Sequence, residues 1–307
     1  MHPPYGPGTG GFGPVSAGIV AVLILLAWSA VFIARRGRRL LGLWERASNS
    51  AVVGETLTWV RDRIGTRGRA LAGRLPASQV AGVALLLGLV VVVTLAVGFT
   101  EVLDDVLEGD GIAGFDQPMT RWLATHRDLW LTSTLRAITV AGDPPFLVVL
   151  ALPIAVAAGW RCRSWRPVVL ALVGGAGVPL MLFTAKVLVG RDRPALPFAL
   201  VDAKGDSFPS GHATGTAAIM VLSAWMLTRW LIRWWTGRVL VWAIATGAVF
   251  VIGFSRVYLG VHYVSDVLAG WLLGMAWGGT VVLVGSWWDH TRRARVHADD
   301  KPMRERR

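Results

Sequence analysis

Long apolar segments constrain the fold of this chain more than any other feature of its sequence. A helix needs about 17–25 predominantly apolar residues to cross a bilayer, and seven segments come near that length. The first two, residues 15–34 and 79–100, contain no charged residue. The other five segments cover residues 144–160, 167–189, 211–228, 239–255 and 263–286. Together the seven segments predict an all-α, polytopic membrane protein.

Composition excludes other classes of protein. Of the 307 residues, 54% are hydrophobic and 16% are charged, whereas soluble domains carry about 25% charged residues. Disordered chains need low hydrophobicity, so this chain is not one of them. A single cysteine, Cys162, excludes an intramolecular disulfide and a cysteine-based zinc cluster.

Charge alternates between the segments that connect the apolar ones. The connections 35–78, 161–166 and 229–238 and the segment 289–307 together carry 23 basic and 7 acidic residues, whereas the rest of the chain carries 8 basic and 12 acidic residues. Connections rich in Lys and Arg stay in the cytoplasm. We therefore expect a plasma-membrane protein with its N-terminus outside and its C-terminus inside. This topology explains the net charge of +12 without a nucleic-acid partner.

Polar residues gather at the ends of some of these segments, although such residues are costly near a membrane and are functional candidates by default. The charge pattern predicts that they all lie at the outer face. They form three clusters, which are Lys186 with Arg193, then Ser210-Gly211-His212, then Arg256 with His262 and Asp266. A lone arginine such as Arg191 is expected only to extend its side chain toward the membrane surface.

One half of this set is suited to binding phosphate. Lys186, Arg193 and Arg256 are cations without an acid beside each of them, as a multiply charged oxyanion requires. Ser210 and Gly211 precede a long helical segment, where a hydroxyl group and free backbone N–H groups bind phosphate well.

The other half is suited to catalysis. His262 and Asp266 are four residues apart and share one face of a helix, so that the carboxylate can hold one imidazole nitrogen and leave the other free to attack. His212 can then protonate a leaving oxygen. The carboxylate cluster of a two-metal phosphatase is missing. The set indicates phosphoryl transfer with a histidine nucleophile.

The same residues form three sequence blocks with fixed internal spacing. They read K-x-x-x-x-x-x-R-P at Lys186–Pro194, P-S-G-H at Pro209–His212 and S-R-x-x-x-x-x-H-x-x-x-D at Ser255–Asp266. In these blocks the chain resembles the type 2 phosphatidic acid phosphatase superfamily, a family of lipid phosphatases. Every block position agrees with the family pattern.

The resemblance implies a role for each residue. His262 is implied to be the nucleophile that forms a phosphohistidine, with Asp266 orienting it, and His212 the acid for the leaving group and then the base for water. No metal and no other cofactor is implied. The phosphate-binding residues implied by the resemblance are Lys186, Arg193, Ser210, Gly211 and Arg256.

The resemblance also implies a six-helix phosphatase core over residues 79–288, to which the chain adds an N-terminal transmembrane helix at 15–34. Residues 1–14 are rich in Gly and Pro and are expected to form a disordered tail outside. Residues 35–78 are expected to form a basic cytoplasmic connector, either as an interfacial helix or as a packed segment. A basic cytoplasmic tail is expected at 289–307.

The expected function is hydrolysis of a lipid phosphate or pyrophosphate at the outer face, with membrane lipids as the other partners. The first choice of substrate is a polyprenyl pyrophosphate of the undecaprenyl type. Phosphatidic acid, phosphatidylglycerophosphate and a lipid phosphotransferase activity are the alternatives. A transporter is disfavoured because the charges gather at one face. The loop 194–208 is either an apolar lip at the bilayer surface or an ordinary packed loop, and the sequence does not set an oligomeric state.

Overall fold

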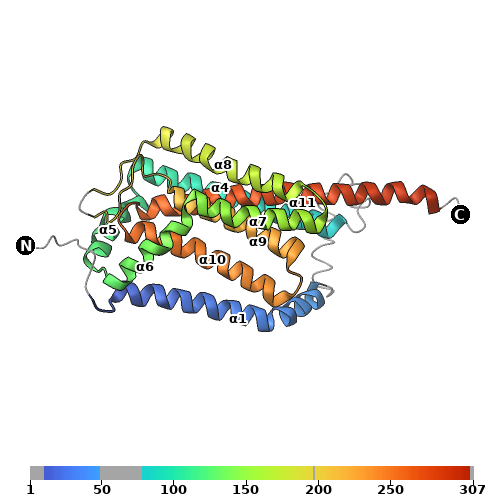
Figure 1. The fold of residues 1–307 in the computed structure, drawn as a ribbon, viewed down its shortest axis with the longest axis horizontal. Coiled ribbons are helices and arrows are strands. Elements are labelled where there is room, and N and C mark those ends of the chain that lie inside the picture. Colours follow the sequence, from blue (N-terminus) through green and yellow to red (C-terminus); the bar gives the residue numbers. More distant parts are fainter. Residues whose placement is uncertain (1–9, 49–77, 196–197, 305–307) are drawn as a thin grey trace, which may run out of the picture.

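The structure, a computed structural model, describes residues 10–48, 78–195 and 198–304, and within these ranges the regular elements are all helices. The long helices lie along one common axis, and the chain alternates between the two ends of the bundle (Figure 1). These helices are α1 (Pro14–Ser48), α4 (Ser78–Glu108), α7 (Pro144–Cys162), α8 (Arg166–Val189), α9 (Gly211–Met226), α10 (Trp235–Tyr258) and α11 (Val264–Arg304). The all-α, multi-pass prediction is confirmed.

Six of the described helices, rather than the seven expected, are long and apolar enough to cross a membrane. The exception is α9, which has 16 residues and continues into a short π-helical segment, η3 (Leu227–Leu231). Most residues of α9 are buried, whereas the apolar windows of the six other helices are 6–39% buried. The segment 211–228 therefore forms the centre of the bundle, surrounded by protein.

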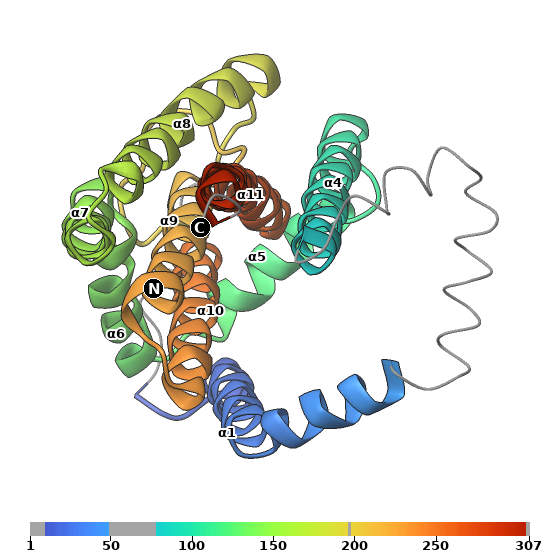
Figure 2. The ribbon, with the colours of Figure 1, turned by 90° about the vertical axis from the view of Figure 1, so that its right-hand side faces the viewer.

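Small residues allow α9 and α11 to pack closely. Gly270, Gly274 and Gly278 follow one another at helical spacing along α11, and a Cβ atom at any of them would lie 3.0 Å or less from an atom of α9. Small residues at such spacing let two helix backbones approach closely within a membrane. Seen from the end of the bundle at which α11 stops, α11 lies between α9 and α4, with α8 beside it (Figure 2).

Short helices cover one end of the bundle, the end at which α1 begins (Figure 1). They are η1 (Ala113–Phe115), α5 (Asp116–Thr125), α6 (Leu129–Thr139) and η2 (Val140–Gly142). At the same end, α8 stops at Gly190, whose positive φ of 58° is the usual left-handed conformation after a helix. The chain then enters the loop that leads to α9.

This loop packs against the body of the protein, so the packed-loop interpretation of residues 194–208 fits the structure better than the lip. Its Leu200 N–H donates to the Leu259 carbonyl at 2.9 Å, and Arg127 donates to the Phe198 carbonyl at 2.6 Å. Leu200 and Val201 are half-buried against the core. Residues 196–197 lie outside the described residues.

Helix α1, the addition to the expected six-helix core, is attached at its first turn. The carboxylate of Asp128 accepts hydrogen bonds from the Gly13 N–H, at 3.1 Å to each oxygen, and from the Ser16 hydroxyl. Phe12 stacks on Trp130, with 5.8 Å between the ring centroids. The helix runs on to Ser48 and so includes the start of the expected connector. The rest of that connector, residues 49–77, lies outside the described residues, as does most of the N-terminal tail. The domain boundaries stay a prediction.

Candidate active site

The three polar clusters of the sequence meet at the end of the bundle that carries α5 and α6. Lys186 lies in the last turn of α8 and Arg256 in the last turn of α10. The Ser210 N–H donates to the Asp266 carbonyl at 3.0 Å, which joins the start of α9 to the start of α11. The sequence blocks therefore form one site, since chain reversals at this end bring them together.

His262 lies in the tight turn between α10 and α11 and is only 2% exposed. Its Nδ1 is 3.5 Å from a carboxylate oxygen of Asp266, and its Nε2 is 3.1 Å from Nη1 of Arg193. Burial lowers the pKa of His262 to about 4, and the positive charges of Arg193 and Arg256 add to this effect against the opposing influence of Asp266. The imidazole is therefore neutral near pH 7, with Asp266 on one nitrogen and a cation beside the other.

Asp266 connects several parts of the site. Besides facing His262, its Oδ2 accepts a hydrogen bond from the Tyr263 N–H at 2.8 Å and one from the Ser207 hydroxyl. Its Oδ1 forms an ion pair with Arg191 at 2.8 Å. Asp266 is fully buried, and a buried carboxylate needs such partners to remain charged. The same contacts fix the orientation of the carboxylate toward His262.

The expectation for Arg191 is wrong. Its guanidinium does not extend to the membrane surface. It binds Asp266 and, at 2.8 Å, Asp116 of α5, and it lies 4.5 Å from the ring centroid of Tyr263. Although burial opposes the effect, the two carboxylates raise the pKa of Arg191. The ion pairs with two buried carboxylates stabilise the guanidinium more than hydration at the membrane surface would.

Sequence reasoning missed Asp116, because nothing near it in the chain indicates its role. Its carboxylate is 1% exposed and binds both Arg191 and Ser265, the latter through the backbone N–H at 3.0 Å and through the hydroxyl. These partners lie 75 and 149 residues further along the chain. Asp116 thus holds the first turn of α11, on which Asp266 lies.

The three predicted phosphate-binding cations have mainly neutral partners. Arg193 donates to backbone carbonyls, including that of Val261 at 2.7 Å, and Lys186 donates to the carbonyl of Asp206. Arg256 donates to the Thr139 hydroxyl at 3.1 Å. Among the described residues, none of the three forms an ion pair. Burial lowers the pKa of Arg193, although the negative charges of Asp266 and Asp206 oppose this effect. Their charge is available to an anion.

Ser210 and Gly211 lie where sequence reasoning placed them, at the start of a helix. Ser210 is the residue before α9 and Gly211 is its first residue. The Ser210 hydroxyl is fully buried without a hydrogen-bond partner, and the same is true of Nε of Arg256. Buried polar atoms are nearly always paired in native proteins, so two unpaired donors beside a helix N-terminus fit a site for an oxyanion.

His212, the second residue of α9, has a partner that sequence reasoning also missed. Its Nε2 lies 2.8 Å from a carboxylate oxygen of Asp143, the residue that precedes α7. Two prolines follow Asp143 and begin α7, a pattern that fixes the position of the preceding residue. Asp143 is half-exposed and therefore lies toward the opening of the site rather than in its interior.

The arrangement supports nucleophilic attack on phosphorus next to a group of cations. An imidazole whose far nitrogen faces a carboxylate at 3.5 Å can act as a nucleophile. A second histidine beside an acid can exchange a proton, and burial lowers the pKa of this histidine, His212, to about 4. Within the described part of the chain, no three His, Cys, Asp or Glu side chains are grouped so as to hold a metal ion.

The chain is similar to proteins that are named as phosphatases. The family model described as the PAP2 superfamily matches residues 145–289. Phosphatidylglycerophosphatase B of Bacillus subtilis is 31% identical over 178 residues, which cover 58% of this chain and 86% of that protein. The decaprenylphosphoryl-5-phosphoribose phosphatase of Mycobacterium tuberculosis is 36% identical over 144 residues, 45% of this chain and 71% of the relative. A putative undecaprenyl-diphosphatase of Escherichia coli is 34% identical over 151 residues, 48% and 69% of the two chains.

A solved structure is similar as well. It is a transmembrane PAP2-type phosphatidylglycerolphosphate phosphatase from Bacillus subtilis, with a TM-score of 0.56 and 29% sequence identity. The match covers 62% of this chain and 93% of that one. Nearly the whole of the solved fold is therefore present here, together with further residues of this chain that have no counterpart in it.

Proposed function

This chain belongs to the PAP2 superfamily and is a multi-pass membrane phosphatase, and on that premise we propose that it hydrolyses a lipid phosphate or pyrophosphate through a phosphohistidine on His262. The observation that carries the proposal is the setting of His262. It is buried, and it lies between the carboxylate of Asp266 and the guanidinium of Arg193.

The reaction has two steps. In the first, Nε2 of His262 attacks phosphorus, the N–P bond forms as the bond to the leaving oxygen breaks, and His212 gives its proton to that oxygen. In the second step, His212 takes a proton from water, whose oxygen attacks phosphorus while the N–P bond breaks. Asp266 stabilises the imidazole as it gains positive charge, and the cations hold the phosphoryl oxygens as they gain negative charge. The phosphate-binding residues in this scheme are Lys186, Arg193, Ser210, Gly211 and Arg256.

The role of His212 predicts an effect that depends on the leaving group. With an alkyl phosphate, His212→Ala should lower kcat by about 10²- to 10⁴-fold, the usual contribution of general acid–base catalysis. With p-nitrophenyl phosphate, whose leaving group needs no proton, a stopped-flow burst of nitrophenolate should persist while turnover stays slow. The control Asp143→Asn keeps the imidazole and should lose less activity. Equal loss of the burst and of alkyl phosphate turnover would contradict a proton-transfer role for His212.

For the substrate, we propose a polyprenyl pyrophosphate, of which the terminal phosphate is removed. Its support is the membrane setting of the site and two relatives whose names refer to decaprenyl and undecaprenyl lipids. Phosphatidylglycerophosphate is the second candidate, because the relatives from Bacillus subtilis are named for it. Phosphatidic acid and a phosphotransferase reaction complete the alternatives.

A substrate panel tests this choice. The purified protein in one detergent, with EDTA present and no acceptor alcohol, should release inorganic phosphate, and kcat/KM should be highest for polyprenyl pyrophosphate. Vanadate should inhibit, because it can take the place of five-coordinate phosphorus on His262. A higher kcat/KM for phosphatidylglycerophosphate than for polyprenyl pyrophosphate would make phosphatidylglycerophosphate the assigned substrate. Loss of activity in EDTA with recovery in Mg²⁺ would refute the metal-independent mechanism, and release of phosphate only with an acceptor would indicate a transferase.

We propose that the site faces the outside of the plasma membrane. The basic residues Arg161, Arg229 and Arg233 lie at the end of the bundle away from the site, which agrees with the positive-inside rule. In a Cys162→Ala background, a cysteine in place of the exposed Lys204 should react with a membrane-impermeant maleimide in intact cells. A cysteine in place of Arg233 should react only after permeabilisation. The reverse pattern would invert the orientation.

A further inference from the structure

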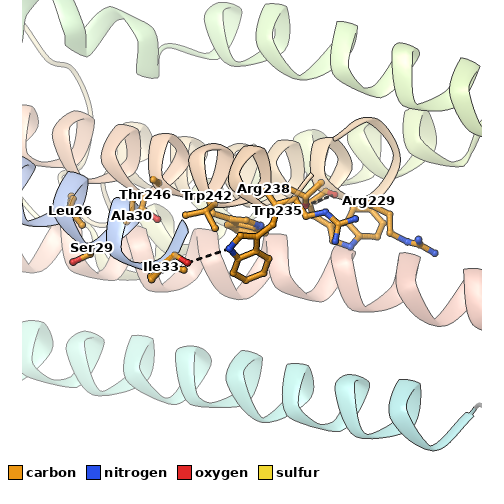
Figure 3. A pocket seen from close by; sticks show the side chains of 13 residues that line it. Leu26, Ser29, Ala30, Ile33, Arg229, Trp235, Arg238, Trp242 and Thr246 are labelled. Carbon is orange, nitrogen blue, oxygen red and sulfur yellow. Dashed lines mark hydrogen bonds between the residues drawn. The ribbon is translucent and has the colours of Figure 1, made fainter. Parts of the chain in front are cut away.

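A second cavity lies at the end of the bundle away from the candidate active site. It lies between α1 and α10 beside η3, and its volume is about 630 Å³ (Figure 3). This volume falls within the range of about 300–1,000 Å³ that is usual for small-molecule sites. Since α1 and α10 are both candidate membrane spans, a groove between them is open to lipid rather than to bulk water.

The groove changes in character along its length. Its inner part is lined by apolar or small side chains, among them Leu26, Ala30 and Ala243. Trp235 and Trp242 follow, and the Trp235 indole N–H donates to the Ile33 carbonyl at 3.3 Å, which joins α10 to α1 (Figure 3). Tryptophan concentrates at the level of lipid headgroups, so this end of the groove lies near the membrane surface.

Two arginines line the outer end of the groove, Arg229 and Arg238 (Figure 3). Arg229 reaches Asp289 at 3.4 Å, but Asp289 also binds Arg166 at 3.0 Å. Arg238 donates through Nε to a neutral acceptor, the Ile232 carbonyl, at 3.1 Å. The described side chains thus leave an excess of positive charge at this end. Guanidinium groups bind phosphate through paired N–H donors.

We propose that this groove binds one anionic phospholipid from the leaflet at the arginine end of the bundle. Arg229 and Arg238 hold its phosphate, and one of its acyl chains lies along Leu26, Ala30 and Ala243. The lipid then fills the space between α1 and α10. The arginines at one end of the groove suit a charged headgroup, and the apolar side chains along the rest of the groove suit an acyl chain. This combination favours an anionic lipid over a protein segment as the occupant. The site is separate from the catalytic residues and does not depend on the substrate.

Lipid binding to the delipidated full-length protein in detergent tests the proposal, with native mass spectrometry as the readout. Dioleoyl phosphatidylglycerol should bind more tightly than dioleoyl phosphatidylcholine, which carries no net charge. Arg229→Gln with Arg238→Gln should weaken phosphatidylglycerol binding about thirtyfold, since an arginine near an anionic headgroup contributes about fivefold each. The matched control Arg161→Gln with Arg233→Gln removes two exposed arginines at the same end, outside the groove, and should leave binding unchanged.

Two further variants keep the test decisive. Ala30→Phe with Ala243→Phe fills the groove without changing charge and should weaken binding of both lipids. Arg238→Gln alone, which breaks no ion pair with Asp289, should weaken phosphatidylglycerol binding about fivefold if the double variant fails to fold. The proposal is overturned if the control pair weakens binding as much as the groove pair, or if the filled groove still binds lipid. It is also overturned if wild type is a dimer that the filled groove converts to a monomer, because a second copy then occupies the groove.

Discussion

His262→Ala should lower turnover of every lipid phosphate by about 10⁴-fold or more, the scale seen when a nucleophile is removed from a site whose residues act as a unit. No other imidazole contacts both Asp266 and Arg193 among the described residues, so no side chain can form the N–P bond in its place. Steady-state phosphate release measures the effect.

A covalent trap separates this loss from misfolding. Wild type mixed with ³²P-labelled p-nitrophenyl phosphate and quenched in alkali should carry a ³²P label that acid releases, as a phosphohistidine does. His212→Ala should carry more of this label, because nitrophenolate leaves without a proton whereas the second step lacks its base. His262→Ala should carry none. His126→Ala is the control, since that ring stacks on Trp122, with 4.6 Å between centroids, away from the site. Turnover by His262→Ala within tenfold of wild type would rule out the covalent mechanism.

Asp266→Asn should give the second-largest loss, about 10³- to 10⁴-fold in kcat, because a neutral amide holds the imidazole in the wrong tautomer and does not stabilise its positive charge. An amide also has one acceptor oxygen, whereas Asp266 accepts from both Tyr263 and Arg191 through different oxygens. Arg191 keeps its second acid, Asp116, so the variant should still fold.

Asp116→Asn is the matched control for this variant. It removes the charge of one of the two carboxylates that form ion pairs with Arg191, but it leaves Asp266, the carboxylate that faces His262. Both variants should lower Tm, as expected when a buried ion pair loses one partner, whereas only Asp266→Asn should lose most of its activity. Equal losses of activity in the two variants would mean that Asp266 acts only by holding the first turn of α11.

The sequence allows some features of the fold to be predicted because they depend on local properties. Apolar length determines which segments become spanning helices, and α9 starts at Gly211 as expected from the helical run behind it, although the Ser210 hydroxyl forms no capping hydrogen bond. Proline determines the start of α7 at Pro144. These features need only the residues of one segment and the membrane around it. Whether α9 counts as a membrane-spanning helix was harder to predict from the sequence. This helix is short, and its position at the centre of the bundle depends on its close packing against the glycines of α11.

Some residues of the candidate site can likewise be identified from the sequence, whereas others can be identified only from the structure. The sequence alone pairs His262 with Asp266, but the expected shared helix face is wrong, because His262 lies in the turn before α11 and only Asp266 lies on that helix. It does not identify Asp116 or Asp143, and it gives the wrong role for Arg191. An ionised side chain buried in protein requires an opposite charge or hydrogen-bond partners wherever the fold provides them. For Arg191 those partners lie 75 residues away in the chain in both directions, so only the packing of α5 against the start of α11 determines them.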